Sequence, residues 1–174
     1  MLLRGINVGG NKRIAMADLR ALLCGLGYTD VATLLQSGNA VFTSAATEPQ
    51  KLAGQIEDGI ATELGMTVRC LVRGSDELRA VIDGNPLGGV ATDGSRLMAL
   101  FLSAQPDPQL LAAHDPRELA PEQVRLGDRV IYQWCPDGIL AAPPVMAFVE
   151  KQLKVTVTGR NWNTVTKLAA LLDG

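Results

Sequence analysis

The sequence is poor in aromatic side chains, which make up 4% of its 174 residues, and it contains a single histidine, His114. A plait domain that binds RNA stacks bases on aromatic residues of its central strands, and here the corresponding strands offer only Phe42. Catalysis by a Ser-His-Asp or Cys-His arrangement would depend on His114, which stands beside Asp115-Pro116 at a predicted helix end. We interpret His114 as a solvent-facing residue.

Cysteine is also scarce, and the pattern excludes the common metal and disulfide motifs. Cys24, Cys70 and Cys135 are far apart and never form a CxxC pair, which argues against a disulfide framework or a zinc ribbon. The sequence contains no HExxH motif and no DxDxDG loop. We therefore expect no metal site and no cofactor. The carboxylates are scattered on predicted helix faces, so no acid/base pair can be nominated and any catalytic residue stays unknown.

A third feature that the sequence lacks is an excess of positive charge. The formal net charge of -2 gives no basic field to concentrate polyanions, which disfavours nucleic acid as a partner. No segment approaches the roughly 20 apolar residues of a transmembrane helix, and the N-terminus does not resemble a signal peptide. We expect a cytoplasmic protein that does not bind membranes. No feature of the sequence specifies an oligomeric state.

The sequence does contain an order of strands and helices that occurs twice. In the first half, apolar alternation predicts strands and helical spacing predicts two helices, the second beginning with a capping box formed by Thr47 and Gln50. A turn at Ser37-Gly38-Asn39 joins two of the strands in a hairpin. The predicted elements are strand 1–3, the helix from Met16 to Gly27, strands 31–35 and 40–43, helix 47–64 and strand 67–72.

The same order returns after a segment rich in glycine and proline. Strand 97–102, a helix from Asp107, strands 124–126 and 129–134, helix 145–153 and strand 155–157 are followed by one more helix, 161–172. This pattern predicts an α+β protein with two ferredoxin-like (βαββαβ) halves, antiparallel sheets with helices on one face, and an extra C-terminal helix. The expected domains are 1–74 and 95–174, joined by a linker with a short helix at 75–94.

The predicted loop from Arg4 to Arg13 connects a strand to a helix and concentrates glycine, asparagine and cations. Free backbone N–H groups, a helix N-terminus and three positive charges would converge there, which suits an anion. The alternative is a tight connection with a solvated basic edge. The segment matches neither the GK[ST] of a phosphate loop nor the GxGxxG fingerprint. The candidate ligand-binding residues in this loop are Arg4, Asn7, Gly9, Gly10, Asn11 and Lys12.

Two further segments are candidates for the same ligand site. Ser37 and Asn39 either shape the hairpin turn or contribute a polar rim, and antiparallel pairing would bring them to the end of the sheet where the first loop begins. The segment from Arg160 to Thr164 crowds a cation, two amides, an indole and a hydroxyl at a predicted helix start. Asn161 would cap that helix and Trp162 would pack against the sheet. The candidates here are Arg160, Asn161, Trp162 and Asn163.

These segments also carry a family resemblance. LLRGINVGGNKRIAMADLRALL, LQSGNAVF and EKQLKVTVTGRNWNTVTKL resemble the signature blocks of a bacterial family called domain of unknown function 1697, in the same order and from Leu2 to Leu168. The resemblance implies the same paired ferredoxin-like architecture. It carries over no substrate, cofactor or catalytic residue. Leu34-Leu35 stands where the family pattern has a tyrosine-containing strand.

Three functions remain as hypotheses. The leading one is a noncatalytic binding or regulatory protein that holds a small anionic ligand between its two halves. The second is an acylphosphatase-like or other phosphate-handling enzyme, in which arginine and asparagine would position a phosphate; it rests on analogy of fold. The third is an RNA-binding plait domain, against which the scarcity of aromatic residues counts.

Overall fold

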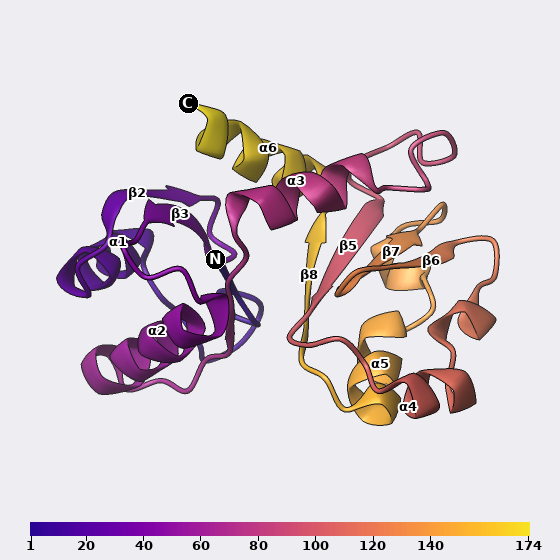
Figure 1. The fold of residues 1–174 in the computed structure, drawn as a ribbon, viewed down its shortest axis with the longest axis horizontal. Helices are drawn as coiled ribbons and strands as arrows, with labels where there is room; N and C mark the ends of the chain where they lie inside the picture. The colour runs from indigo at the N-terminus through magenta and orange to yellow at the C-terminus, as the bar shows by residue number, and fades with distance from the viewer. The chain divides into compact units, whose positions relative to one another are not determined.

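The computed structural model describes residues 1–174, and the chain forms two compact units. The first unit contains residues 1–75 together with 168–174, and the second contains residues 76–167. Each unit has one four-stranded sheet in which every strand pairing is antiparallel, and helices accompany both sheets (Figure 1). The chain is therefore a mixed α+β protein. None of its helices is both long and apolar enough to cross a membrane.

The sheet of the first unit has the strand order β2-β3-β1-β4. Its central strand β1 is short, and Leu2 pairs with Asn39 of β3 on one side and with Leu71 of β4 on the other. The elements of this unit are β1 (Leu2–Leu3), α1 (Met16–Gly25), β2 (Thr29–Leu34), β3 (Asn39–Thr43), α2 (Pro49–Leu64) and β4 (Cys70–Leu71).

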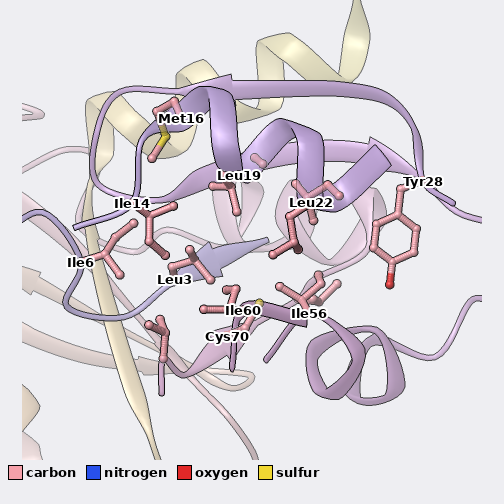
Figure 2. Packing of buried hydrophobic residues seen from close by; sticks show 14 of the residues in the cluster. Leu3, Ile6, Ile14, Met16, Leu19, Leu22, Tyr28, Ile56, Ile60 and Cys70 are labelled. Atoms are coloured by element: carbon pink, nitrogen blue, oxygen red, sulfur yellow. The ribbon is translucent and has the colours of Figure 1, made fainter. Parts of the chain in front are cut away.

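The core of the first unit lies between one face of this sheet and the two helices α1 and α2 (Figure 2). Helical spacing places apolar residues on one stripe of each helix, and Leu19 and Ile56 are fully buried there. Burial of each such side chain contributes about 1.5–3 kcal/mol. Tyr28 and Phe42 stack at the edge of the core with ring centroids 4.4 Å apart. Other members of the core are Leu3, Ile6, Ile14, Leu22, Ile60 and Cys70.

Two details of the first unit differ from the sequence prediction. The residue before the first turn of α2 is Glu48, and no side chain caps the helix, so the predicted capping box of Thr47 and Gln50 is wrong. Pro49 starts the helix instead, because its fixed φ suits the first helical position and it has no N–H to satisfy. The fourth strand is shorter than predicted, since only Cys70 and Leu71 pair with β1, which itself has two residues.

The sheet of the second unit has the strand order β6-β7-β5-β8. The elements of this part of the chain are α3 (Ser75–Asp83), β5 (Leu97–Leu102), α4 (Pro108–Ala113), β6 (Val124–Gly127), β7 (Val130–Trp134), α5 (Val145–Leu153), β8 (Val157–Asn161) and α6 (Trp162–Asp173), with short 3-10 helices η1 (Pro116–Leu119) and η2 (Ile139–Ala141). Residues 168–174, the end of α6, belong to the first unit.

The strand β8 begins where the sequence prediction ended it. Lys154 adopts a left-handed φ of 58° after α5, and the carboxylate of Glu150 accepts a hydrogen bond from the backbone of Val157 at 3.1 Å. The chain therefore enters the sheet at Val157 and pairs with β5 as far as Asn161. Gly159 and Arg160, which sequence alone would place in a loop, become strand residues because the pairing with β5 satisfies their backbone groups.

Helices contact both faces of the second sheet, which corrects the prediction of helices on one face. Leu100, Ile131 and Val157 point to the face that packs with α4 and α5. Tyr132 points to the opposite face, where its hydroxyl donates to the backbone oxygen of Val81 in α3 at 2.7 Å. Burial raises the pKa of Tyr132. The continuous apolar run of β5 agrees with this arrangement, because a strand covered on both faces needs apolar residues at every position.

Candidate functional site

Asn7 organises the loop between β1 and α1. Its backbone is left-handed, with a φ of 54°, and its N–H donates to the oxygen of Lys12 at 2.8 Å. The side-chain amide donates to the oxygen of Ile14 at 2.9 Å, and its Oδ1 accepts from the N–H of Ile14 at 3.0 Å. Asparagine tolerates this conformation better than most residues, and both ends of its side chain close the loop.

The same side chain joins the loop to the hairpin turn between β2 and β3. Nδ2 of Asn7 donates to the oxygen of Gln36 at 2.6 Å, and the N–H of Leu3 donates to the oxygen of Gly38 at 2.8 Å. The two segments therefore meet at one end of the first sheet, where antiparallel pairing was expected to bring them.

Ser37 and Asn39 shape the turn from the inside. Asn39 has no exposed surface, and its Nδ2 donates to the oxygen of Leu34 and to Oγ of Ser37, each at 2.9 Å. Positive φ angles fall on Leu35 at 58° and Gly38 at 82°. A Cβ on Gly38 would lie 2.7 Å from Cβ of Leu3, so only glycine fits against β1.

The tip of the loop, Val8 to Asn11, is exposed. None of its backbone N–H groups donates to an acceptor within the protein. Lys12 and Arg13 follow directly and are also exposed; Nζ of Lys12 donates to the oxygen of Thr67 at 2.8 Å. Arg4 is half-buried, and its backbone N–H donates to the oxygen of Arg69 at 2.9 Å. Open amides beside cations form a surface that can bind an anion.

The candidates of the second unit surround the start of α6. Oδ1 of Asn161 accepts from the N–H of Thr164 at 3.0 Å and from its hydroxyl at 2.9 Å, which is the predicted cap. The N–H of Trp162 donates to the oxygen of Gly94 at 3.0 Å. The rings of Trp162 and Tyr132 lie 6.2 Å apart between centroids, so the indole packs against the sheet as predicted.

The remaining two candidates of this segment differ in exposure. Arg160 is 9% exposed, and its guanidinium donates to the oxygen of Gly159 at 2.8 Å. It shares a sheet face with Thr158, whose hydroxyl is buried without a hydrogen-bond partner. Asn163 is exposed and lies so close to Gly94 that a Cβ there would meet its Oδ1. In this segment most polar groups are thus engaged inside the fold.

Sequence reasoning missed the backbone acceptors that hold these side chains. The oxygens of Gln36, Thr67 and Gly94 receive hydrogen bonds from Asn7, Lys12 and Trp162. Any residue supplies a backbone oxygen, so residue type gives no signal for this role.

Comparison with known proteins places this chain in a family. The model of the family described as "Protein of unknown function (DUF1697)" matches residues 1–132. The chain belongs to this family. The family membership expected from the sequence is thereby confirmed, over residues 1–132. No curated protein matches the chain.

A solved structure has a similar fold. The conserved bacterial protein SP0830 from Streptococcus pneumoniae is similar to this chain with a TM-score of 0.64 and 23% sequence identity. The similarity covers 98% of this chain and 96% of that one, so it includes both units and not one sheet alone. At this identity the comparison supports the fold.

Proposed function

We propose that this protein is a binding protein for a small anionic ligand, and that the loop of residues 4–14, hereafter the Asn7 loop, forms the ligand site of the first unit. The observation that carries the proposal is the exposed tip, in which the N–H groups of Val8 to Asn11 have no acceptor within the protein. An oxyanion can accept from such groups, while Lys12 and Arg13 supply opposite charge beside them.

The anchoring of the loop supports this proposal. Asn7 fixes both ends of the loop through Ile14 and ties it to Gln36, so the tip projects from a defined base. A loop held in this way loses less conformational entropy when it binds a ligand than a free segment does. Gly9, with a φ of 50° and open space around it, lets the backbone approach a ligand closely.

We propose further that both halves have the ferredoxin-like βαββαβ architecture. The element order from β1 to β4 is the same as that of the elements β5, α4, β6, β7, α5 and β8. The strand orders β2-β3-β1-β4 and β6-β7-β5-β8 are also equivalent, each with the first strand of its half between the third and the fourth. In such a plait the loop after the first strand and the hairpin between the second and third strands share one end of the sheet.

The two other hypotheses have less support from the described residues. Of the asparagines that a phosphate-handling enzyme could use, Asn39 is fully buried and its amide donates to Leu34 and Ser37, so this residue does not orient a reacting group. RNA stacking would need an exposed aromatic residue on β3, whereas Phe42 stacks on Tyr28 beside the core. The role of residues 160–163 in binding stays a prediction.

The proposal is tested by titrating the full chain with inorganic phosphate, ADP and succinate while amide shifts are followed by NMR. We expect one or more of these anions to shift the amides of Val8 to Asn11. The double variant Lys12→Ala/Arg13→Ala should weaken that binding about tenfold, since charge-assisted hydrogen bonds contribute about 1.5–3 kcal/mol when sheltered and less when exposed.

Lys51→Ala is the matched control, because Lys51 is an exposed cation on α2. It should change neither affinity nor stability. The proposal is overturned if no anion shifts the loop amides, or if the double variant binds as tightly as the wild type. Thermal unfolding of each variant separates lost binding from lost structure; exposed substitutions of this kind usually change stability by less than about 0.5 kcal/mol.

A further inference from the structure

The second unit contains a hollow of about 400 Å³ that no part of the proposed anion site uses. One wall is residues 119–123, from the last residue of η1 to the start of β6, and the other is residues 135–138 and 141–143, which lie between β7 and α5 and include the end of η2. Its volume falls in the range of about 300–1,000 Å³ that is usual for small-molecule sites.

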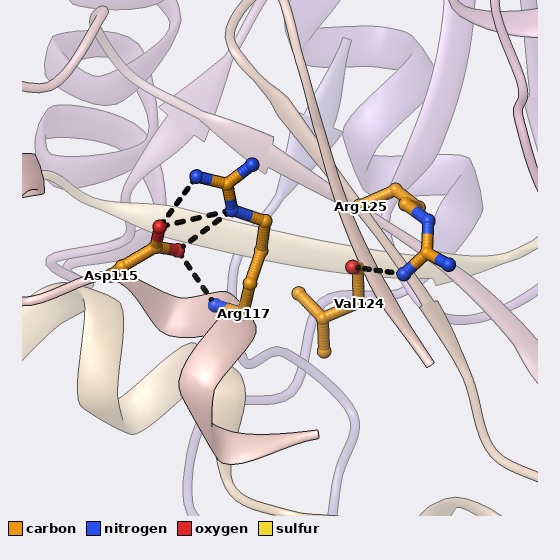
Figure 3. Close-up of polar contacts among 4 residues, drawn as sticks. All are labelled: Asp115, Arg117, Val124 and Arg125. Carbon is orange, nitrogen blue, oxygen red and sulfur yellow. Dashed lines mark hydrogen bonds and ion pairs between the residues drawn. The ribbon is translucent and has the colours of Figure 1, made fainter. Parts of the chain in front are cut away.

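The walls of this hollow are held by hydrogen bonds and by prolines. Arg125 donates to the oxygens of Pro121 at 2.6 Å and Val124 at 2.9 Å, the second of which is drawn in Figure 3. Arg96 donates to the oxygen of Pro136 at 2.6 Å on the other wall. The N–H of Trp134 donates to the oxygen of Gln123 at 2.8 Å and connects the two walls. The hollow is therefore formed before any ligand enters.

A charged pair braces the 3-10 helix that leads into the first wall. The guanidinium of Arg117 donates to both carboxylate oxygens of Asp115, and the backbone N–H of Arg117 donates to Oδ1 (Figure 3). The hydrogen bonds from Arg117 lower the pKa of Asp115. Asp115 therefore stays ionised to a lower pH than an ordinary aspartate does, and its bonds to Arg117 hold the start of η1.

The chemistry of the lining favours a cation. Glu122 and Asp137 are the only charged residues in it, and neither forms a hydrogen bond or an ion pair within the protein. The nearby guanidinium groups are engaged, since Arg125 holds backbone oxygens and Arg96 also pairs with Asp93 at 3.7 Å. The rest of the lining is Leu119, three alanines, three prolines, Gly138, the polar side chain of Gln123 and the buried thiol of Cys135. Burial raises the pKa of that thiol, which is therefore neutral.

We propose that this hollow binds a small organic cation, an ammonium compound with a short apolar chain. The two free carboxylates would attract the ammonium group, and the alanine and proline side chains would contact the chain. Leu119, which is 36% exposed, lines the hollow and adds apolar surface. This hollow would bind a cation, whereas the Asn7 loop would bind an anion. The protein would therefore have two separate sites for ligands of opposite charge.

The test compares three probes of equal chain length on the full protein: n-hexylammonium, 1-hexanol and hexanoate. NMR titration should show n-hexylammonium shifting the amides of residues 119–123 and 135–143, with hexanol weaker and hexanoate weakest. Each of the variants Glu122→Gln and Asp137→Asn should weaken n-hexylammonium binding about two- to fivefold, as is usual for exposed ion pairs. Ala142→Leu should fill the hollow and reduce binding of all three probes.

Asp128→Asn is the matched control, because this carboxylate is 87% exposed in the β6–β7 turn, outside the hollow. It should leave n-hexylammonium binding unchanged. The proposal is overturned if n-hexylammonium shifts no amide of the two walls, if hexanoate binds equally well, or if the carboxylate variants bind as the wild type does. Thermal unfolding confirms that every variant is folded. Phosphate binding at Val8 to Asn11 is measured separately, so either proposal can fail alone.

Discussion

Each unit contains a polar segment organised by one asparagine, but the two asparagines do different things. In the Asn7 loop, Asn7 bonds to Ile14 and Gln36 and leaves the tip from Val8 to Asn11 exposed. In the segment of residues 160–164, hereafter the Asn161 cap, Oδ1 of Asn161 accepts hydrogen bonds from the N–H and the hydroxyl of Thr164 and so caps the first turn of α6.

This difference separates two uses of the same residue type. In the Asn7 loop, the side chain of Asn7 forms its hydrogen bonds at the base of the loop, with Ile14 and Gln36. The backbone N–H groups of the tip, Val8 to Asn11, are therefore open to solvent and to a ligand. In the Asn161 cap, the side chain of Asn161 accepts hydrogen bonds from Thr164 in the first turn of α6, and the N–H of Trp162 donates to the oxygen of Gly94. The residue types of the two segments are equally polar. Only their hydrogen-bond partners show which polar groups are free to bind a ligand and which are already bonded within the fold.

The largest effect should come from Gly38→Ala, which separates the turn from the Asn7 loop. The new Cβ would lie 2.7 Å from Cβ of Leu3 and 2.8 Å from Cδ1 of Ile6, at a φ of 82°. We expect a loss of about 2–4 kcal/mol in the free energy of unfolding. Gly9→Ala has a φ of 50° but open space around it, so it should cost only about 1 kcal/mol. Chemical denaturation measures both; equal losses would show that packing against β1 is not what fixes the turn.

Asn7→Ala should have the next largest effect, because it removes three side-chain hydrogen bonds and places alanine at a left-handed φ. We expect a loss of about 2–3 kcal/mol together with weaker anion binding. Asn7→Asp is the sharper variant: its carboxylate can still accept from the N–H of Ile14, but it can donate neither to the oxygen of Ile14 nor to that of Gln36. If Asn7→Asp were as stable as the wild type, the two hydrogen bonds that the Asn7 amide donates would not anchor the loop.

Asn161→Ala should cost less, about 1 kcal/mol, which is the usual contribution of a helix cap. Asn161→Asp should keep most of the stability, because a carboxylate accepts the same hydrogen bonds and favours the positive end of the helix. Denaturation of both variants, with phosphate titration alongside, tests the comparison. A loss of phosphate affinity without a loss of stability in Asn161→Ala would make the cap a ligand-binding element after all.

Much of the fold could be predicted from the sequence, because hydrophobic periodicity is a local signal. The stripe on α1, the strand Leu97–Leu102 and the helix after Pro144 all follow from spacing. Hydrophobic periodicity does not predict an element whose structure depends on pairing with a strand far away in the sequence. Strand β8 includes Gly159 and Arg160 only because β5 lies beside them, and α3 packs on the second sheet through Tyr132 and Val81, a contact that no periodicity encodes.

The candidate site was predictable in residue type but not in role. The sequence identified Asn7, Asn39 and Asn161 as unusual, and all three carry hydrogen bonds that shape the backbone. It could not separate them from the exposed Gly9, Gly10 and Asn11, because exposure depends on which side of the loop faces the sheet. The hollow beside Pro121 gave no sequence signal, since its walls meet only in the folded unit.

The last prediction concerns pH, to which the two segments should respond differently. Ser95 donates its hydroxyl, at 2.6 Å, and its N–H, at 2.9 Å, to Oδ1 of Asp93, and these bonds lower the pKa of that carboxyl. The turn they hold includes Gly94, whose oxygen accepts from Trp162. A group with a lowered folded pKa stabilises the fold above its ordinary pKa of about 3.9, and this contribution is lost as the pH falls through the lower folded value. The bonds of Asn7 join amide and backbone groups only, so they have no titrating member.

In an NMR titration, the amide of Trp162 should therefore move with an apparent pKa below the ordinary carboxyl range, and Asp93→Asn should abolish that movement without altering the amide of Ile14. If the Trp162 amide titrates equally in Asp93→Asn, the start of α6 does not depend on this turn. The oxygen of Gly94 would then be held in place by the helix before it and the strand after it, and not by the hydrogen bonds to Asp93.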